Sequence, residues 1–116
     1  MQGYQSLIVW QKAMDLVTAT YEATQSFPSE ERFGLVSQMR RAAVSIPSNI
    51  AEGSFRRGKS NKEFFRIAYG SGAELETQLM ISKRLAYIEN ELYDKVHNLL
   101  VEVMKMLNTL ISKNSN

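Results

Sequence analysis

The chain has 116 residues and a mass of 13.2 kDa, with 44% hydrophobic residues, 22% charged residues and a formal net charge of +2. This size suits one compact domain, residues 1–116, and excludes most multidomain enzymes. The absence of cysteine excludes disulfides, thiolate metal sites, iron–sulfur clusters and a cysteine nucleophile.

Apolar residues recur at spacings of three and four along the whole chain, which predicts helices throughout. The first predicted helix spans residues 5–26, and Phe27-Pro28-Ser29 forms the turn after it. Its inward face comprises Val9, Ala13, Leu16, Val17, Thr20 and Thr24.

A second helix is predicted to begin at Ser29, which is a good N-cap residue. Glu30 and Glu31 then lie in the first turn, where negative charge interacts favourably with the helix dipole. The inward residues of this helix are Leu35, Met39, Ala42, Ala43, Ile46 and Ile50.

Pro47 lies inside the second helical pattern and removes the amide that would bond to the carbonyl of Ala43. Because the apolar pattern continues past Pro47, we expect a kink rather than an end. Gly53 is expected to end the helix and to start a basic loop that reaches Ser60.

The third predicted helix spans residues 60–87, and Ser60 with Glu63 has the spacing of a capping box. Gly70 and Gly72 are unfavourable inside a helix, so we expect them to allow close approach of another backbone, that of the second helix. The inward face comprises Phe64, Ile67, Ala68, Ser71, Leu75, Gln78, Leu79, Ser82 and Leu85.

A fourth helix is predicted over residues 89–112, followed by a polar end. Its inward face comprises Leu92, Val96, Leu99, Val103, Met106, Leu107 and Leu110. Four long helices with short connections predict an all-α fold, an antiparallel up-and-down four-helix bundle whose second helix is kinked at Pro47.

Several helices carry a second apolar flank beside the inward face. This second apolar flank consists of Leu7, Trp10, Met14 and Tyr21, then Phe65, Tyr69, Gly72, Met80 and Tyr87, then Tyr93, Leu100, Met104 and Ile111. Two interpretations are open: a wide core face, or a surface for homo-oligomerisation, since aromatic residues and methionine are enriched at interfaces.

The sequence offers little catalytic chemistry. His97 is the single histidine and is interpreted as a residue at the flank of the fourth helix. No Glu-x-x-His element and no phosphate-binding glycine motif is present. We therefore expect no enzyme activity, no catalytic residue, no metal and no cofactor.

Basic residues gather between residues 40 and 66, where seven cationic side chains accompany two glutamates. Arginine binds phosphate through two parallel hydrogen bonds, so this basic cluster is a candidate nucleic-acid-binding surface. The alternative is a solvated loop that keeps the protein soluble. Phe55 is interpreted as an anchor of the loop in the bundle rather than as a stacking platform. The basic cluster consists of Arg40, Arg41, Arg56, Arg57, Lys59, Lys62 and Arg66.

A set of polar residues shares one side of the second helix: Gln38, Arg41, Ser45, Asn49 and Glu52. The preferred interpretation is an exposed helix face. The alternative is a hydrogen-bond network in which Arg41 pairs with Glu52 or Glu74 and a side chain donates to the Ala43 carbonyl.

Several segments together resemble a known family. They are residues 27–35, residues 38–43, the signature Ser45-Ile46-Pro47-Ser48-Asn49-Ile50-Ala51-Glu52-Gly53, the opening Val9-Trp10-Gln11-Lys12-Ala13 and residues 64–78. The chain resembles the four-helix-bundle proteins encoded in intervening sequences of bacterial 23S ribosomal RNA genes. This resemblance implies a left-handed bundle, a ring-shaped homopentamer, and kinship with the accessory variability determinant of diversity-generating retroelements, which works with a reverse transcriptase and nucleic acid.

The leading hypothesis is a non-enzymatic oligomer that binds RNA or another nucleic acid through the basic cluster. The alternative is a structural scaffold or accessory subunit that docks a protein partner such as a polymerase. The polar start of the chain, with charge inside the first apolar stretch, leads us to expect no signal peptide, no membrane span and a cytoplasmic location.

Overall fold

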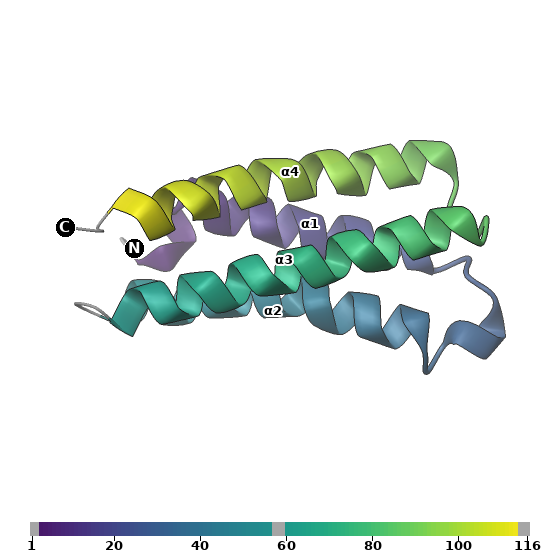
Figure 1. The fold of residues 1–116 in the computed structure, drawn as a ribbon, viewed down its shortest axis with the longest axis horizontal. Helices are drawn as coiled ribbons and strands as arrows, with labels where there is room; N and C mark the ends of the chain where they lie inside the picture. Colours follow the sequence, from purple (N-terminus) through teal and green to yellow (C-terminus); the bar gives the residue numbers. More distant parts are fainter. Residues whose placement is uncertain (1–2, 57–59, 114–116) are drawn as a thin grey trace.

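The computed structural model describes residues 3–56 and 60–113 and contains four long antiparallel helices (Figure 1). Within these residues each long helix packs against two others, so that α1 contacts α2 and α4, and α3 contacts α2 and α4. This arrangement is the predicted up-and-down four-helix bundle. The elements are η1 (Tyr4–Ser6), α1 (Ile8–Thr24), η2 (Ser29–Glu31), α2 (Leu35–Phe55), α3 (Ser60–Arg84) and α4 (Asn90–Lys113).

The bundle measures 45 × 28 × 24 Å and is elongated along the helices. One end holds η1, the end of α2, the start of α3 and the end of α4 (Figure 1). We call it the α2–α3 end, and the opposite end holds η2 and the connection from α3 to α4. In the described part of the chain, no helix combines the length and apolar character needed to cross a membrane.

Helix α1 begins later than predicted, because residues 4–6 form a short 3-10 turn and Leu7 is extended. The hydroxyl of Ser6 donates to the carbonyl of Gly3 at 2.8 Å, which stabilises this turn. At the other end, Thr20 and Thr24 are buried, and each hydroxyl bonds a carbonyl four residues earlier. The predicted inward face is confirmed, because Val9, Ala13 and Leu16 are also buried and Val17 packs on the core.

Helix α2 begins at Leu35, so the prediction that it starts at Ser29 is wrong. Residues 29–31 form the separate 3-10 turn η2, and Gly34 has a backbone conformation outside the helical region. The carboxylate of Glu31 accepts a hydrogen bond from the amide of Leu35, which satisfies one of the free amides at the start of α2.

Helix α2 continues through Pro47, which is buried, and past Gly53 to Phe55. The continuation past Pro47 is as predicted, whereas the end at Gly53 is wrong. Gly53 instead allows helix α3 to come close: a Cβ there would lie 2.7 Å from Cε1 of Phe65 and 3.1 Å from the carbonyl oxygen of Asn61. No side chain of the described residues donates to the carbonyl of Ala43.

The inward face of α3 is confirmed in part, because Ala68, Ser71, Leu75, Leu79 and Ser82 are buried as predicted. The buried face as a whole is rotated about the helix relative to the prediction. Phe65, assigned to the second apolar flank, is buried in the core, because the missing side chain of Gly53 leaves space for its ring. Ile67 and Leu85, predicted to face inward, are 50% and 51% exposed. Phe64, also predicted to face inward, is partly buried. The predicted start at Ser60 is confirmed, but its side chain lies outside the described part, so the capping box stays a prediction.

Gly70 and Gly72 do not contact α2, so that prediction is wrong. A Cβ on Gly70 would meet no atom within 4 Å. Gly72 lies against α4, where the sulfur of Met104 occupies the space of the missing side chain. Gly72 therefore makes room for a side chain of α4 and not for the backbone of α2.

Helix α3 ends at Arg84, three residues before the predicted end. Ala86 has a φ of 61°, in the left-handed region. The amide of Tyr87 bonds to the carbonyl of Ser82 and the amide of Ala86 to that of Lys83, which is the hydrogen-bond pattern of a Schellman motif. The ring of Tyr87 then packs on Phe27, with a centroid separation of 5.6 Å.

Tyr87 also donates a hydrogen bond from its hydroxyl to Oε2 of Glu31 at 3.2 Å. Desolvation and this neighbouring carboxylate raise the pKa of the Tyr87 phenol above its usual value of 10.0. The assignment of Tyr87 to the second apolar flank is therefore wrong, because its ring connects η2 to the segment after α3.

Helix α4 buries Val96, Leu100, Val103 and Leu107. Leu100 was assigned to the second apolar flank but is only 1% exposed, so it belongs to the core. The other predicted inward residues of α4 pack against the core from its margin: Leu92, Leu99, Met106 and Leu110. Two ion pairs fasten α4 to α1, between Lys12 and Glu102 and between Lys95 and Glu22, each at 3.1 Å.

Candidate nucleic-acid interface

Arg56 directly follows the last turn of α2 and is held in place by two contacts. Its guanidinium is 3.1 Å from a carboxylate oxygen of Glu52, one helical turn earlier, and lies 5.0 Å from the centre of the Phe64 ring on α3. About half of the side chain is exposed. The Glu52 pair fixes the orientation of Arg56 but leaves much of the cation open to solvent, where a phosphate can approach it.

Lys62 and Arg66 lie on the first two turns of α3, at the same end of the bundle. They are four residues apart and therefore share one side of the helix. Lys62 is partly exposed and Arg66 is exposed, and neither forms an ion pair with another described residue. Arg57 and Lys59 of the basic cluster lie outside the described residues.

Arg40 lies far from this end, and its side chain contacts α1. Its Nε donates to the hydroxyl of Thr24 at 3.0 Å, and its Nη2 donates to the carbonyl of Tyr21 at 3.3 Å. Its guanidinium also lies 4.4 Å from the centre of the Tyr21 ring. These contacts give Arg40 a role in joining α1 to α2.

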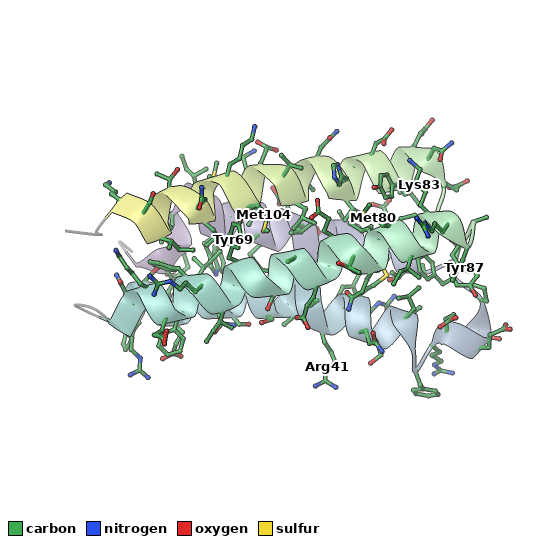
Figure 2. The ribbon with its side chains drawn as sticks, in the orientation of Figure 1. Arg41, Tyr69, Met80, Lys83, Tyr87 and Met104 are labelled. Carbon is green, nitrogen blue, oxygen red and sulfur yellow. The ribbon has the colours of Figure 1, made fainter. Side chains whose placement is uncertain are left out.

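Arg41 points away from α2 into solvent (Figure 2). It is 15 residues from Arg56 along one helix, which corresponds to about 22 Å. The basic cluster is therefore not one continuous patch. Arg56, Lys62 and Arg66 lie together at the α2–α3 end, whereas Arg40 and Arg41 lie toward the other end of α2.

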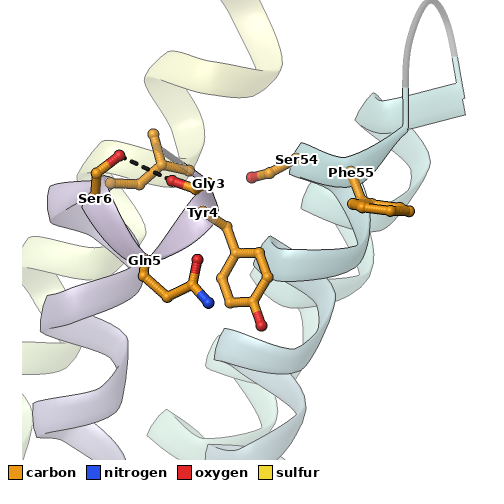
Figure 3. A pocket seen from close by; sticks show the side chains of 7 residues that line it. Gly3, Tyr4, Gln5, Ser6, Ser54 and Phe55 are labelled. Carbon is orange, nitrogen blue, oxygen red and sulfur yellow. Dashed lines mark hydrogen bonds between the residues drawn. The ribbon is translucent and has the colours of Figure 1, made fainter. Parts of the chain in front are cut away.

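A hollow of about 320 Å³ lies between η1 and the last turn of α2 (Figure 3). We call it the N-terminal hollow, and it is lined by Gly3, Tyr4, Gln5, Ser6, Leu7, Ser54 and Phe55. Phe55 is 85% exposed, so the interpretation of this residue as an anchor in the bundle is wrong. An exposed aromatic ring thus lies directly beside Arg56.

The polar residues of α2 form part of a groove shared with α3. Ser71 of α3 donates its hydroxyl hydrogen bond to Oγ of Ser45 at 2.8 Å, and the amide of Asn49 donates to both the carbonyl and the hydroxyl of Ser45. Glu74 and Gln78 line the same groove, and the Oε1 atom of Gln78 is buried with no hydrogen-bond partner among the described residues.

This network between helices differs from the predicted one in its members. Within residues 3–56 and 60–113, Arg41 forms no ion pair with Glu52 or Glu74, and Glu52 pairs with Arg56 instead. The preferred interpretation of a simple exposed face is incomplete, because Ser45 and Asn49 are partly buried and bonded.

Exposed apolar residues lie on two opposite sides of the bundle. Met14 and Val44 line a hollow between α1 and α2 together with Trp10. Tyr69 and Met104 line another hollow, between α3 and α4, with the polar residues Glu76, Lys105 and Asn108, and Met80 lies farther along the same face (Figure 2). We call these two sides the α1–α2 face and the α3–α4 face.

His97 stacks on Tyr93 with nearly parallel rings, 5.6 Å between centroids, and its Nε2 lies 3.8 Å from a carboxylate oxygen of Glu76. Among the described residues, no group of three or more histidine and acidic side chains is arranged to hold a metal ion. His97 thus lies at the flank of α4, as predicted.

A family model described as "23S rRNA-intervening sequence protein" matches residues 5–109, which is most of the chain. The chain belongs to the 23S rRNA-intervening sequence protein family. None of the curated proteins compared with the chain matches it.

A solved structure shows the same fold. It is a protein of unknown function from the S23 ribosomal protein family of Bacteroides thetaiotaomicron, and its TM-score with this chain is 0.81. The match covers 90% of this chain and 95% of the other, with 24% identical residues. At this level of identity the comparison establishes a shared fold.

In this member of the family, the N-terminal hollow is the feature that the sequence did not predict. Residues 4–6 were placed in or before a regular helix, and their 3-10 turn is what positions Tyr4 opposite the end of α2. The sequence feature that points to this site is an aromatic residue next to an arginine, Phe55-Arg56. This feature alone does not show whether the ring is exposed, because large apolar residues are usually buried.

Proposed function

We propose that this protein binds the phosphate backbone of RNA or another nucleic acid at the α2–α3 end, as a homo-oligomer and without catalysis. The observation that carries the proposal is the gathering of Arg56, Lys62 and Arg66 at one end of the bundle. Arg57 and Lys59 lie between them in the sequence. Backbone phosphates are contacted mainly by arginine and lysine, and such contacts provide affinity without sequence information.

The same end has few acidic residues to oppose an anion. Glu52 and Glu63 are the carboxylates of residues 52–66, against five cationic side chains. The start of α3 adds the positive end of a 25-residue helix dipole. Both features favour an anionic ligand over a cationic one.

Homo-oligomerisation is the second part of the proposal. A ring requires two different complementary surfaces on each subunit. The α1–α2 face and the α3–α4 face are two different surfaces with exposed apolar residues on opposite sides of the bundle. The family resemblance makes a pentamer the expected assembly, and a ring would repeat the cationic residues several times, which multiplies weak phosphate contacts.

The first prediction concerns salt dependence and charge removal. We expect the protein to bind structured RNA and single-stranded RNA, with log affinity falling linearly as log salt rises. The double variant Lys62→Gln/Arg66→Gln should lower the affinity. It should also reduce the slope of log affinity against log salt concentration by roughly 0.7–0.9 for each lost phosphate contact. Fluorescence anisotropy at several salt concentrations measures both, with the oligomer mass recorded in the same buffers.

The matched control removes the same charge at the opposite end of the bundle. The variant Arg32→Gln/Arg84→Gln alters two exposed arginines beyond η2 and at the end of α3, and we expect it to keep the slope of the unaltered protein. A well-formed oligomer that binds no RNA at low salt would contradict the proposal. In that case the α2–α3 end would be examined as a docking surface for an acidic protein partner, such as a polymerase.

A further inference from the structure

Two of the residues that line the N-terminal hollow are aromatic. Tyr4 belongs to η1, and Phe55 belongs to the last turn of α2, where its ring lies at the edge of the hollow and is directed away from Tyr4 (Figure 3). The volume of about 320 Å³ is at the lower limit of small-ligand sites, which run from about 300 Å³. A space of this size with rings beside it suits one flat aromatic group rather than a large ligand.

Phe55 does not contribute to the core, because 85% of its surface is exposed. Phe33, at the other end of α2, is similarly exposed at 87% and lies over its neighbour Arg32. Both rings have cationic neighbours. Phe33 lines a hollow with Arg32, Arg40 and Arg41, and Phe55 lies at the end that holds Arg56, Lys62 and Arg66. Of the two rings, Phe55 is the one that lines the N-terminal hollow.

The two serine hydroxyls of the hollow offer little means of distinguishing one base from another. The hydroxyl of Ser6 donates to the carbonyl of Gly3, and the hydroxyl of Ser54 donates to the carbonyl of Ile50 at 2.7 Å. Both hydroxyls therefore face a ligand mainly as acceptors. A stacked ring is tolerated whatever its edge presents, because every base has a π face.

We propose that one unpaired base of a single-stranded nucleic acid stacks on Phe55 at the edge of the N-terminal hollow, while the adjoining phosphates contact Arg56, Lys62 and Arg66. This inference rests on the proposed function and adds a preference to it. Single strands and loops present unstacked bases, whereas a duplex must first unstack and unpair one, which costs a few kcal/mol. The protein therefore prefers single-stranded regions over a blunt duplex.

The test uses three labelled probes of one sequence without internal structure: a single-stranded RNA of about 12 nucleotides, the same DNA strand, and the DNA duplex. The full-length protein binds the single strands more tightly than the duplex. Phe55→Ala lowers affinity for both single strands by roughly 5- to 150-fold, the effect of losing one base–aromatic stack, and leaves duplex affinity unchanged. Phe55→Tyr, which keeps a ring, restores single-strand binding.

Phe33→Ala is the matched control, since it removes an equally exposed ring beside an arginine and leaves all three affinities unchanged. Trp10 gives an independent readout, because this single tryptophan contacts Tyr4 edge-to-face at 5.4 Å between centroids. Its emission changes on addition of either single strand. Circular dichroism verifies that each variant keeps its helices.

The outcomes separate this inference from the proposed function. If Phe55→Ala binds the single strands as well as the unaltered protein while Lys62→Gln/Arg66→Gln binds them weakly, the base site is wrong and the phosphate site stands. Equal loss with Phe33→Ala also overturns the base site. Absence of binding to all three probes at low salt overturns both proposals. Binding of the RNA strand without binding of the DNA strand also contradicts the base site, because stacking on Phe55 and contacts with phosphates do not distinguish RNA from DNA.

Discussion

Arg40 and Arg41 are neighbours in the sequence and both belong to the basic cluster, yet they have different environments. The Arg40 guanidinium bonds the Thr24 hydroxyl and the Tyr21 carbonyl and lies over the Tyr21 ring. Arg41, one residue on, is turned by 100° about the helix and points into solvent. Arg40 is partly buried and bonded to another helix, so it is less available to a phosphate than the half-exposed Arg56.

We therefore expect Arg40→Gln to lower the free energy of unfolding by about 1–2 kcal/mol, because hydrogen bonds from a charged donor and a cation–π contact are lost. Arg41→Gln should change it by less than about 0.5 kcal/mol, as is usual for an exposed residue. Urea denaturation of the two variants measures the difference. Equal stability of both variants would show that the Arg40 contacts do not hold α1 to α2.

Ala86 is a second residue whose backbone matters more than its side chain. Its φ of 61° is costly for an L-amino acid with a Cβ, and glycine adopts this conformation readily. We expect Ala86→Gly to raise the free energy of unfolding by about 0.5–1 kcal/mol, with a higher Tm in a thermal melt. As a control, Ala73→Gly, on the exposed side of α3, should lower it by about 1 kcal/mol. If both glycines destabilise the protein, strain at Ala86 is not the reason.

At the scale of the helices, the contact between α2 and α3 depends on Gly53. We expect Gly53→Ala to lower the free energy of unfolding by about 1–3 kcal/mol, because the new methyl group would clash with the Phe65 ring and the Asn61 carbonyl. Shortening the partner in Gly53→Ala/Phe65→Leu should recover part of this loss. Urea denaturation of the single and double variants gives both values.

Gly70 is the matched control for Gly53, since it lies in the middle of α3 with open space around it. Gly70→Ala should raise the free energy of unfolding by about 0.5–1 kcal/mol, because alanine loses less backbone entropy in a helix. If Gly53→Ala stabilised the protein as Gly70→Ala is expected to do, the close contact between α2 and α3 at Gly53 would not contribute to stability.

The number, order and approximate limits of the helices could be predicted from the sequence, because apolar periodicity is a local property. The ends were less predictable for identifiable reasons. Helix α3 ends at a Schellman motif that carries alanine where glycine is typical, and α2 starts after a 3-10 turn whose residues also suit an N-cap. The rotation of α3 could not be predicted, because the space for Phe65 is created by Gly53 on another helix.

At the scale of the whole molecule, the sequence indicated which residues are basic but not which of them lie together. Arg56, Lys62 and Arg66 are brought to one end because α2 and α3 run antiparallel from a shared connection. The exposure of Phe55 and its position opposite η1 depend on packing between elements 50 residues apart in the chain. Such contacts leave no periodic signal in a single sequence.

The pairing of Ser45 with Ser71 also fixes the relative alignment of two helices. A slide of α3 by one helical turn along α2 would displace α3 by about 5.4 Å. The hydroxyls of Ser45 and Ser71 would then be too far apart to bond, and both would lie between the helices without this hydrogen bond. The same slide would push the Phe65 ring off the gap at Gly53. Purely apolar helices can often repack after such a shift at small cost. Helices α2 and α3, in contrast, have two specific contacts, Ser45–Ser71 and Gly53–Phe65, that form together in one register only. This register is encoded in the helices themselves, so the connection between them can vary in length without altering how they align.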